Sequence, residues 1–370
     1  MATGAMLATA TPVAAPASAA QSGTDIGRLI QLASLGGSGS TADDMNERGD
    51  MIGQSADAAQ NLRGVVWWHG RRTPTDLDID HASPRAINDL GHIAGRVEQG
   101  NGQLFLWRRG TVTYLREPAG LDLDTADLND RDQVIGTAYD QNLDTRAFLW
   151  QRGRLTLLPV PKGTISTAVG INNRGDVIGN VERRGAETRQ AVLWRGGRMV
   201  RLGTLGGESS AAVAINDRGQ VIGNSTAKGA SDGRPFLWQR GRMTDLLART
   251  TATSGRATAL SDTGMITGSA SWADPSRPVL WRAGTMIDIG LPGRTGVGRA
   301  INDRGDVVGL TWPEPPEGSA VPFRWQSGHT TLFPEPFGDV DVGVVGIDSH
   351  GTIGLAQETT HSGYIVLRSA

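Results

Sequence analysis

Short apolar runs alternate with short polar turns along most of this chain, and the same pattern returns at a nearly fixed interval. In one copy, Ala214 and Ile215 precede the polar segment 216–219, and Val221 and Ile222 follow it. Two extended runs joined by a short polar loop with a late glycine predict a β-hairpin. We expect a type I turn followed by a left-handed residue in a G1 bulge, because glycine takes that conformation without steric cost.

This turn occurs eight times. Its first residue is Asn, Ser or Asp, whose side chain can bond the backbone two residues further on. The eight first residues are Asn46, Asn88, Asn129, Asn172, Asn216, Ser261, Asn302 and Asp348, and consecutive copies lie 42, 41, 43, 44, 45, 41 and 46 residues apart. Glycine ends the turn in every copy but the third, where Asp132 takes its place. A fixed period of this length is typical of a repeat architecture.

The acidic turns also suggest calcium-binding loops as an alternative. No loop of the EF-hand type with a terminal Glu follows any of them, and calcium sites of that type need this ligand. Arginine stands inside five of the turns, as Arg48, Arg131, Arg174, Arg218 and Arg304. We therefore expect no metal site.

Each full repeat predicts four short strands. Strand A ends at the turn, strand B is the Val-Ile-Gly run after it, strand C ends in aromatic residues such as Phe148-Leu149-Trp150, and strand D follows a glycine, as in 154–158. Four strands per period of this length indicate a β-propeller blade. The tryptophan that ends strand C should fill the gap between twisted blades. A β-helix and a leucine-rich repeat fit less well, because their periods or frameworks differ.

The eighth repeat predicts how the ring closes. It reaches strand C at Tyr364-Ile365-Val366 and lacks a strand D, whereas residues 28–32 form a strand D with no blade of its own. Pairing of 28–32 with 363–367 would leave no open sheet edge. The predicted fold class is therefore all-β: an eight-bladed β-propeller over residues 27–370, closed by an N-terminal strand in the last blade.

Composition narrows the class of protein. The net charge of −2 gives no electrostatic reason to expect nucleic acid, and the chain has no cysteine. No apolar run is long enough to span a membrane. Residues 1–26 lie outside the repeats, and Ala17-Ser18-Ala19 fits a signal-peptidase site, so we expect a secreted or extracytoplasmic protein. We also expect a monomer without a cofactor. A disordered alanine-rich tail and a cytoplasmic location are the alternative.

Three segments of the repeat carry a family resemblance. They are Phe-Leu-Trp, Leu-Gly-Thr-Leu-Gly-Gly and Ala-Ile-Asn-Asp-Arg-Gly, and 199–223 is the best copy. The unit resembles the HAF-repeat family of probable extracellular bacterial proteins over residues 27–366. The His-Ala-Phe triplet is replaced by Arg146-Ala147-Phe148, Gln190-Ala191-Val192 and Arg234-Pro235-Phe236. The resemblance implies an exported repeat protein and supplies no catalytic residues.

Catalytic motifs are absent from the sequence. There is no Walker A loop, H-E-x-x-H segment or G-x-S-x-G elbow. The six histidines fall at different positions of different repeats, which is typical of solvated loop residues. Ser261-Asp262-Thr263-Gly264 resembles one sialidase Asp-box, but the same place holds Asn-Asp-Arg-Gly in other copies.

Charged residues replace small ones on two of the predicted innermost strands. The position two before the turn is Ala or Gly in six copies and becomes Asp44 and Asp127 in the others. The neighbouring position carries Arg85 and Arg299. These charges could line a central funnel and bind an anion or a polar ligand. The alternative is a water-filled funnel with incidental charges.

Aromatic residues mark the predicted B–C loops. Trp272 and Trp312 occupy nearly equal offsets in neighbouring repeats, and Tyr139 has a similar offset in the third. In a four-stranded blade the B–C and D–A loops emerge on one face, where aromatic side chains suit stacking on a sugar or contact with a protein. The alternative is packing within the loops.

Two classes of function remain. The first is an extracytoplasmic binding or protein-interaction module that takes a glycan, small molecule or protein at the B–C/D–A loop face through Arg85, Arg299, Trp272, Trp312 and Tyr139. The second is a hydrolase or lyase that uses Asp44 and Asp127 as acid and base, which would require split pKa values. The sequence shows no oriented base or nucleophile, and this favours the binding module.

Overall fold

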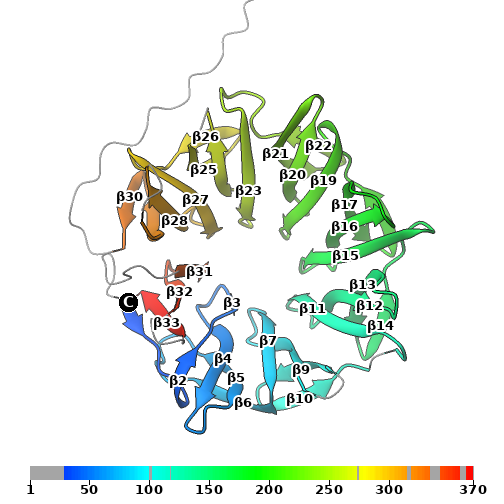
Figure 1. The fold of residues 1–370 in the computed structure, drawn as a ribbon, viewed down its shortest axis with the longest axis vertical. Coiled ribbons are helices and arrows are strands. Elements are labelled where there is room, and N and C mark those ends of the chain that lie inside the picture. The colour runs from blue at the N-terminus through cyan, green and yellow to red at the C-terminus, as the bar shows by residue number, and fades with distance from the viewer. Residues whose placement is uncertain are drawn as a thin grey trace, which may run out of the picture.

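The protein folds into a ring of β-sheets around one axis (Figure 1). The computed structural model describes residues 29–99, 102–116, 118–272, 275–314, 318–333, 342–358 and 364–369. These residues form eight antiparallel sheets. No helix among them is long and apolar enough to cross a membrane. The predicted all-β, eight-bladed propeller is confirmed. Residues 1–28 lie outside the described residues.

Seven sheets are built from consecutive strands. The first blade holds β2 (Gly36–Ser40), β3 (Asp44–Met45), β4 (Met51–Asp57), β5 (Leu62–Trp67) and β6 (Thr75–Asp80). The second holds β7 (Ala82–Ile87), β8 (Ile93–Val97), β9 (Leu104–Arg108) and β10 (Thr111–Tyr114). The third holds β11 (Asp122–Leu128), β12 (Val134–Tyr139), β13 (Thr145–Gln151) and β14 (Arg154–Leu157). The fourth holds β15 (Thr164–Ile171), β16 (Val177–Arg183), β17 (Arg189–Arg195) and β18 (Arg198–Arg201).

The remaining blades follow the same order. The fifth holds β19 (Gly206–Ile215), β20 (Val221–Ala227), β21 (Ala230–Gln239) and β22 (Arg242–Asp245). The sixth holds β23 (Ser254–Leu260), β24 (Ile266–Ser271), β25 (Ser276–Arg282) and β26 (Thr285–Asp288). The seventh holds β27 (Arg294–Ile301), β28 (Val307–Pro313), β29 (Val321–Gln326) and β30 (His329–Leu332). The eighth combines β31 (Val342–Ile347), β32 (Ile353–Glu358) and β33 (Tyr364–Ser369) with β1 (Leu29–Gln31).

The N-terminal strand closes the ring, as predicted, but in a different register. Leu29 lies opposite Ser369 and Gln31 lies opposite Leu367, so β1 meets residues 367–369 rather than 363–367. In the second to seventh blades a tight hairpin pairs strand D with the last residues of strand C, as Thr111 pairs with Arg108. β1 takes the same place although no hairpin joins it to β33, and this explains the shift.

The repeated turn between strands A and B has the predicted geometry. The N–H of Gly49 donates to the carbonyl oxygen of Asn46 at 3.0 Å, and the N–H of Asn46 donates to the carbonyl of Asp50 at 3.1 Å. The seven late glycines have φ between 71° and 90°, and Asp132 has φ 57°. The predicted type I turn with a left-handed residue is confirmed.

The asparagine side chains of these turns also join one blade to the next. The side-chain oxygen of Asn46 accepts hydrogen bonds from the N–H groups of Arg48 and Asp50 within its own turn. The Nδ2 of Asn46, Asn88, Asn129, Asn172, Asn216 and Asn302 donates to the backbone oxygen of the first residue of the next turn, at 2.9 to 3.0 Å. We call these contacts the asparagine belt.

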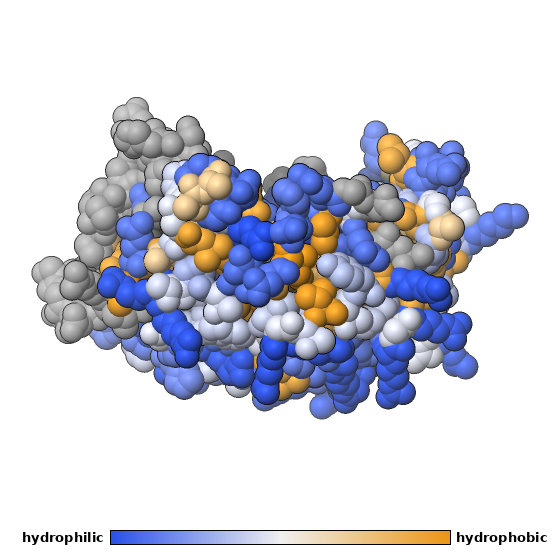
Figure 2. Space-filling view, turned by 90° about the horizontal axis from the view of Figure 1, so that it is seen from below, coloured by the Kyte–Doolittle hydropathy of each residue, from blue (hydrophilic) through white to orange (hydrophobic). Residues whose placement is uncertain are grey.

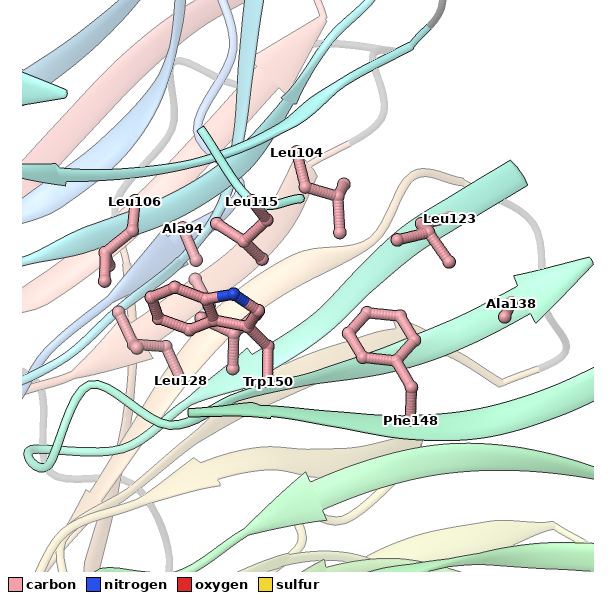
Figure 3. Close-up of a cluster of buried hydrophobic side chains, with 11 residues drawn as sticks. Ala94, Leu104, Leu106, Leu115, Leu123, Leu128, Ala138, Phe148 and Trp150 are labelled. Carbon is pink, nitrogen blue, oxygen red and sulfur yellow. The ribbon is translucent and has the colours of Figure 1, made fainter. Parts of the chain in front are cut away.

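The hydrophobic core lies between neighbouring blades. Trp150 and Phe148 of the third blade pack against Leu104, Leu106 and Leu115 of the second (Figure 3). The tryptophans that end strand C are at most 8% exposed, in seven blades: Trp67, Trp107, Trp150, Trp194, Trp238, Trp281 and Trp325. The prediction that they fill the gaps between blades is confirmed.

Candidate functional site

The strand order gives the disc two different faces. Because the four strands of a blade alternate in direction, the A–B and C–D turns emerge on one face and the B–C and D–A loops on the other. We call them the turn face and the loop face. Each face has its own concave polar site, and of the predicted residues only Asp44 and Asp127 line one of them.

At the turn face, a cavity of about 310 Å³ lies on the axis. Asp44 of the first blade and Asp127 of the third both line it. Five further carboxylates surround it: Glu47, Asp89, Asp130, Asp217 and Asp262. Asp44 and Asp127 thus share one cavity, and we call it the axial pocket.

The oxygens of Asp44 and Asp127 are already occupied by backbone donors. Asp44 accepts from the N–H of Met45 at 2.8 Å and from the N–H of Ile87 in the next blade at 3.0 Å. Asp127 repeats this pattern with Leu128 at 2.7 Å and Ile171 at 2.9 Å. Each carboxylate therefore braces two blades, which favours a structural role over acid–base catalysis.

Burial makes these carboxyl groups weak acids. It raises the pKa of Asp127 to about 7 and that of Asp44 to about 6, against the opposing effect of the N–H donors. Burial, with the neighbouring charge of Asp89 and other carboxylates, raises the pKa of Glu47 to about 7. Several groups of the axial pocket therefore exchange protons near neutral pH.

The two predicted funnel arginines do not line the axial pocket. Arg85 on β7 lies 3.7 Å from both Asp43 and Glu98, and all three side chains are partly solvated. Arg299 on β27 is exposed and forms no ion pair with any described residue. Of the four predicted charges, Asp44 and Asp127 therefore meet in the axial pocket, whereas Arg85 and Arg299 lie outside it.

The three predicted aromatic residues lie at the loop-face ends of strands in different blades. Trp272 follows β24, where the guanidinium of Arg277 stands 4.8 Å from its ring and the ring packs on the core of the sixth blade. Arg277 is itself paired with the buried Asp288 at 2.8 Å. Trp312 lies opposite Thr295, and Tyr139 opposite Asp122. These contacts favour loop packing for Trp272, and a stacking role for the three stays a prediction.

A larger cavity of about 530 Å³ opens at the loop face between the fourth, fifth and sixth blades. Ser254, Ser271 and Ser276 are cross-strand neighbours on one wall of it, and Arg256 pairs with Ser269 in the adjacent row. Arg189 at the start of β17 lines the same cavity from the fourth blade. We call this cavity the loop-face pocket.

The polar side chains of the loop-face pocket fall into two sets, buried serines and exposed arginines. Ser210 and Ser225 are 2% exposed and bond the framework, through the N–H groups of Ala191 and Leu205. Arg189 and Arg256 are exposed, and neither forms an ion pair or side-chain hydrogen bond within the described part of the chain. Two unpaired guanidinium groups beside serine hydroxyls can bind an anionic group that carries hydroxyls.

Sequence reasoning missed this pocket, although one signal was present. Five positions before the turn, Arg256 stands where other copies have Thr41, Ser83, Asp124, Thr167, Ala211, Val297 and Gly343. It is the only positive charge at that position. Arg189 could not have been found in this way, because it approaches from another blade. Among the described residues, no group of three His, Asp or Glu side chains could hold a metal ion.

Comparison with known proteins supports the fold and little more. No family model and no curated protein matches the chain. The propeller domain of the Trilobed protease from Pyrococcus furiosus is 12% identical, with a TM-score of 0.52 over 80% of this chain and 99% of that one. A prolyl endopeptidase is also 12% identical, with a TM-score of 0.56 over 86% of this chain and 54% of that one.

A third similar structure is the acylaminoacyl peptidase from Pyrococcus horikoshii. It is 12% identical, with a TM-score of 0.52 over 86% of this chain and 58% of that one. These likenesses show a β-propeller fold. The chain spans little more than half the length of the two peptidases. At this identity their activities do not transfer to it.

Proposed function

We propose that this protein is an extracytoplasmic binding module whose loop-face pocket takes an anionic glycan or a small anionic polyol. The observation that carries the proposal is the pair Arg189 and Arg256, which reach one cavity from two blades and form no ion pair with any described residue. An exposed guanidinium presents a planar fork of donors that matches a carboxylate or phosphate.

The serine wall extends this recognition to hydroxyl groups. Ser254, Ser271 and Ser276 stand side by side on three strands, and a hydroxyl both donates and accepts. A sugar ring presents hydroxyls of the same kind at its edge. Glu187 also lines the pocket and disfavours a densely charged ligand. The combination fits a ligand with one acidic group and several hydroxyls.

Binding to arrayed glycans tests this proposal. The parent protein should bind uronate- or phosphate-bearing glycans and ignore their neutral counterparts. Arg189→Ala with Arg256→Ala should weaken that binding by at least about tenfold, because hydrogen bonds to a charged group contribute about 1.5 to 3 kcal/mol each. Arg116→Ala with Arg131→Ala is the matched control, since both arginines are exposed and neither lines the pocket.

Two results would contradict the proposal. One is equal binding of neutral and acidic glycans by the parent, and the other is equal affinity of the double variant and the parent. Asp44 and Asp127 share the axial pocket, so a hydrolase is the second candidate, although their hydrogen bonds from the backbone favour a structural role. The same glycans therefore serve in an assay for released reducing ends. Release that is lost in Asp127→Asn would favour a hydrolase.

A further inference from the structure

The hairpins between strands C and D share one geometry on the turn face. In the second to seventh blades, the first turn residue has φ between 48° and 56° and the second is a glycine with φ between 75° and 92°. Positive φ at both central residues defines a type I′ turn of two residues. Because the hairpins have equal length and repeat around a disc, their tips lie at similar height on one face.

Arginine occupies the strained position of three of these turns. Arg109, Arg152 and Arg240 have φ of 48°, 50° and 51°. Side chains other than Asn, Asp and Gly are disfavoured in this region, and Asn-Gly or Asp-Gly is the common choice. Local turn geometry therefore does not explain the arginines. Strain at repeated exposed positions points to a use for the side chain.

The hairpins of the second to sixth blades are basic throughout. Their segments 108–111, 151–154, 195–198, 239–242 and 282–285 contain no Asp or Glu. Arg108 and Arg195 are paired with Asp132 and Asp176. The others are exposed and form no ion pair with any described residue: Arg109, Arg152, Arg154, Arg198, Arg240, Arg242 and Arg282. We call these seven the basic arc.

The acidic groups of the same face lie nearer the axis and are held inward. Asp89 accepts from the N–H of Glu47 at 2.9 Å, and Asp130 accepts from the N–H of Asp89 at 2.9 Å. Asp217 accepts in the same way from Asn173. The A–B turns near the axis therefore mix these carboxylates with arginines such as Arg131 and Arg218, whereas the C–D hairpins of the second to sixth blades, at the rim, carry arginine and no carboxylate. In Figure 2, long hydrophilic side chains project from the lower edge of the disc.

We propose that the basic arc docks the turn face on an anionic lipid surface. The arc follows the curved rim over five consecutive blades. A straight rod such as duplex nucleic acid would reach only neighbouring hairpins, whereas a plane reaches all tips at once. Basic residues are attracted to anionic headgroups within a Debye length. In this orientation the loop-face pocket points away from the membrane and stays open, and the inference does not depend on what that pocket binds.

Cosedimentation with lipid vesicles tests the inference. The full chain should bind vesicles of phosphatidylglycerol and phosphatidylcholine, release them at high salt, and ignore phosphatidylcholine alone. The variant with Arg109→Asn, Arg152→Asn and Arg240→Asn should bind about 100-fold more weakly, at about fivefold per arginine. Asparagine is favoured in a type I′ turn, so this variant should fold and melt at or above the parent temperature.

The matched control keeps the charge. Arg109→Lys, Arg152→Lys and Arg240→Lys together should bind vesicles within about threefold of the parent, since the attraction depends on charge. The inference is overturned if the asparagine variant binds like the parent, or if the parent binds neutral vesicles equally well. It is also overturned if the parent binds heparin or duplex DNA and does not bind the anionic vesicles.

Discussion

The asparagine that begins six of the eight A–B turns makes three contacts that neither Ser nor Asp can make together. Its oxygen closes the turn on two N–H groups, and its Nδ2 donates across to the next blade, as Asn216 does to the carbonyl of Ser261 at 3.0 Å. Aspartate has no donor when ionised, and serine is shorter. The asparagine belt is therefore interrupted after Ser261 and after Asp348.

Asp348 should be replaceable with a gain in stability. It is fully buried, and its Oδ2 accepts no hydrogen bond from any described residue and lies 3.7 Å from Nδ1 of His69. Asp348→Asn places a donor where six other blades have one and removes a buried charge. We expect the free energy of unfolding to rise by about 1 kcal/mol in urea melts at pH 8.

The reverse change in an intact turn is the control. Asn216→Asp removes a donor and places a charge against a carbonyl oxygen, so it should destabilise the protein by about 2 kcal/mol. If Asp348→Asn is destabilising instead, the contact between Asp348 and His69 outweighs the missing hydrogen bond.

Among the elements, the strands that repeat every period could be predicted from their apolar runs, because each run and its turn are local in sequence. Features that depend on contact between blades could not be predicted in this way. The asparagine belt, the bracing by Asp44 and Asp127, and the loop-face pocket each join residues about one repeat or more apart. Strand A of the first blade also departs from the pattern, since β2 and β3 are separate strands that both pair with β4.

The closing strand is short, and its contribution can be measured. β1 pairs over three residues with β33, and Leu29 packs against the core of the eighth blade. Without it, β33 becomes an exposed edge. A chain of residues 32–370 should be less stable than a chain of residues 27–370 by about 2 to 4 kcal/mol, from lost ladder bonds and apolar burial.

Thermal and urea unfolding of the two chains provide the measurement. Both chains retain Leu32 and Ala33, and the carbonyl oxygen of Ala33 accepts a hydrogen bond from the indole N–H of Trp67. The comparison therefore isolates the contribution of β1. The shorter chain should also associate more readily at high concentration, because its edge can pair with another molecule. Equal melting temperatures would mean that the ring does not need this strand to close.

For the whole molecule, the carboxyl groups around the axis link stability to pH. Burial raises the pKa of Asp127 to about 7 and that of Asp44 to about 6, whereas an aspartate in the unfolded chain titrates near 4. Between about pH 4 and pH 7 the folded state therefore binds more protons than the unfolded state. The free energy of unfolding should fall as the pH rises through this window and level off above about pH 8.

Asp127→Ala isolates one of these groups. Alanine occupies the same place as Ala86, Ala214, Ala259 and Ala300 in other blades, so the fold accommodates it. The fall in unfolding free energy between pH 5 and pH 8 should be smaller than in the parent by about 2 kcal/mol. Urea melts at pH 5, 6, 7 and 8 provide the measurement.

Asp57→Ala supplies the contrast for this experiment. Hydrogen bonds from the backbone and side chain of Asn61 lower the pKa of Asp57, so any stability it adds is present above the ordinary aspartate pKa and is lost only on stronger acidification. Its replacement should shift the stability equally at pH 5 and pH 8 and leave the difference between them unchanged. If Asp127→Ala also leaves that difference unchanged, the carboxyl of Asp127 is ionised throughout this range. The axial pocket would then hold a permanent ring of negative charge.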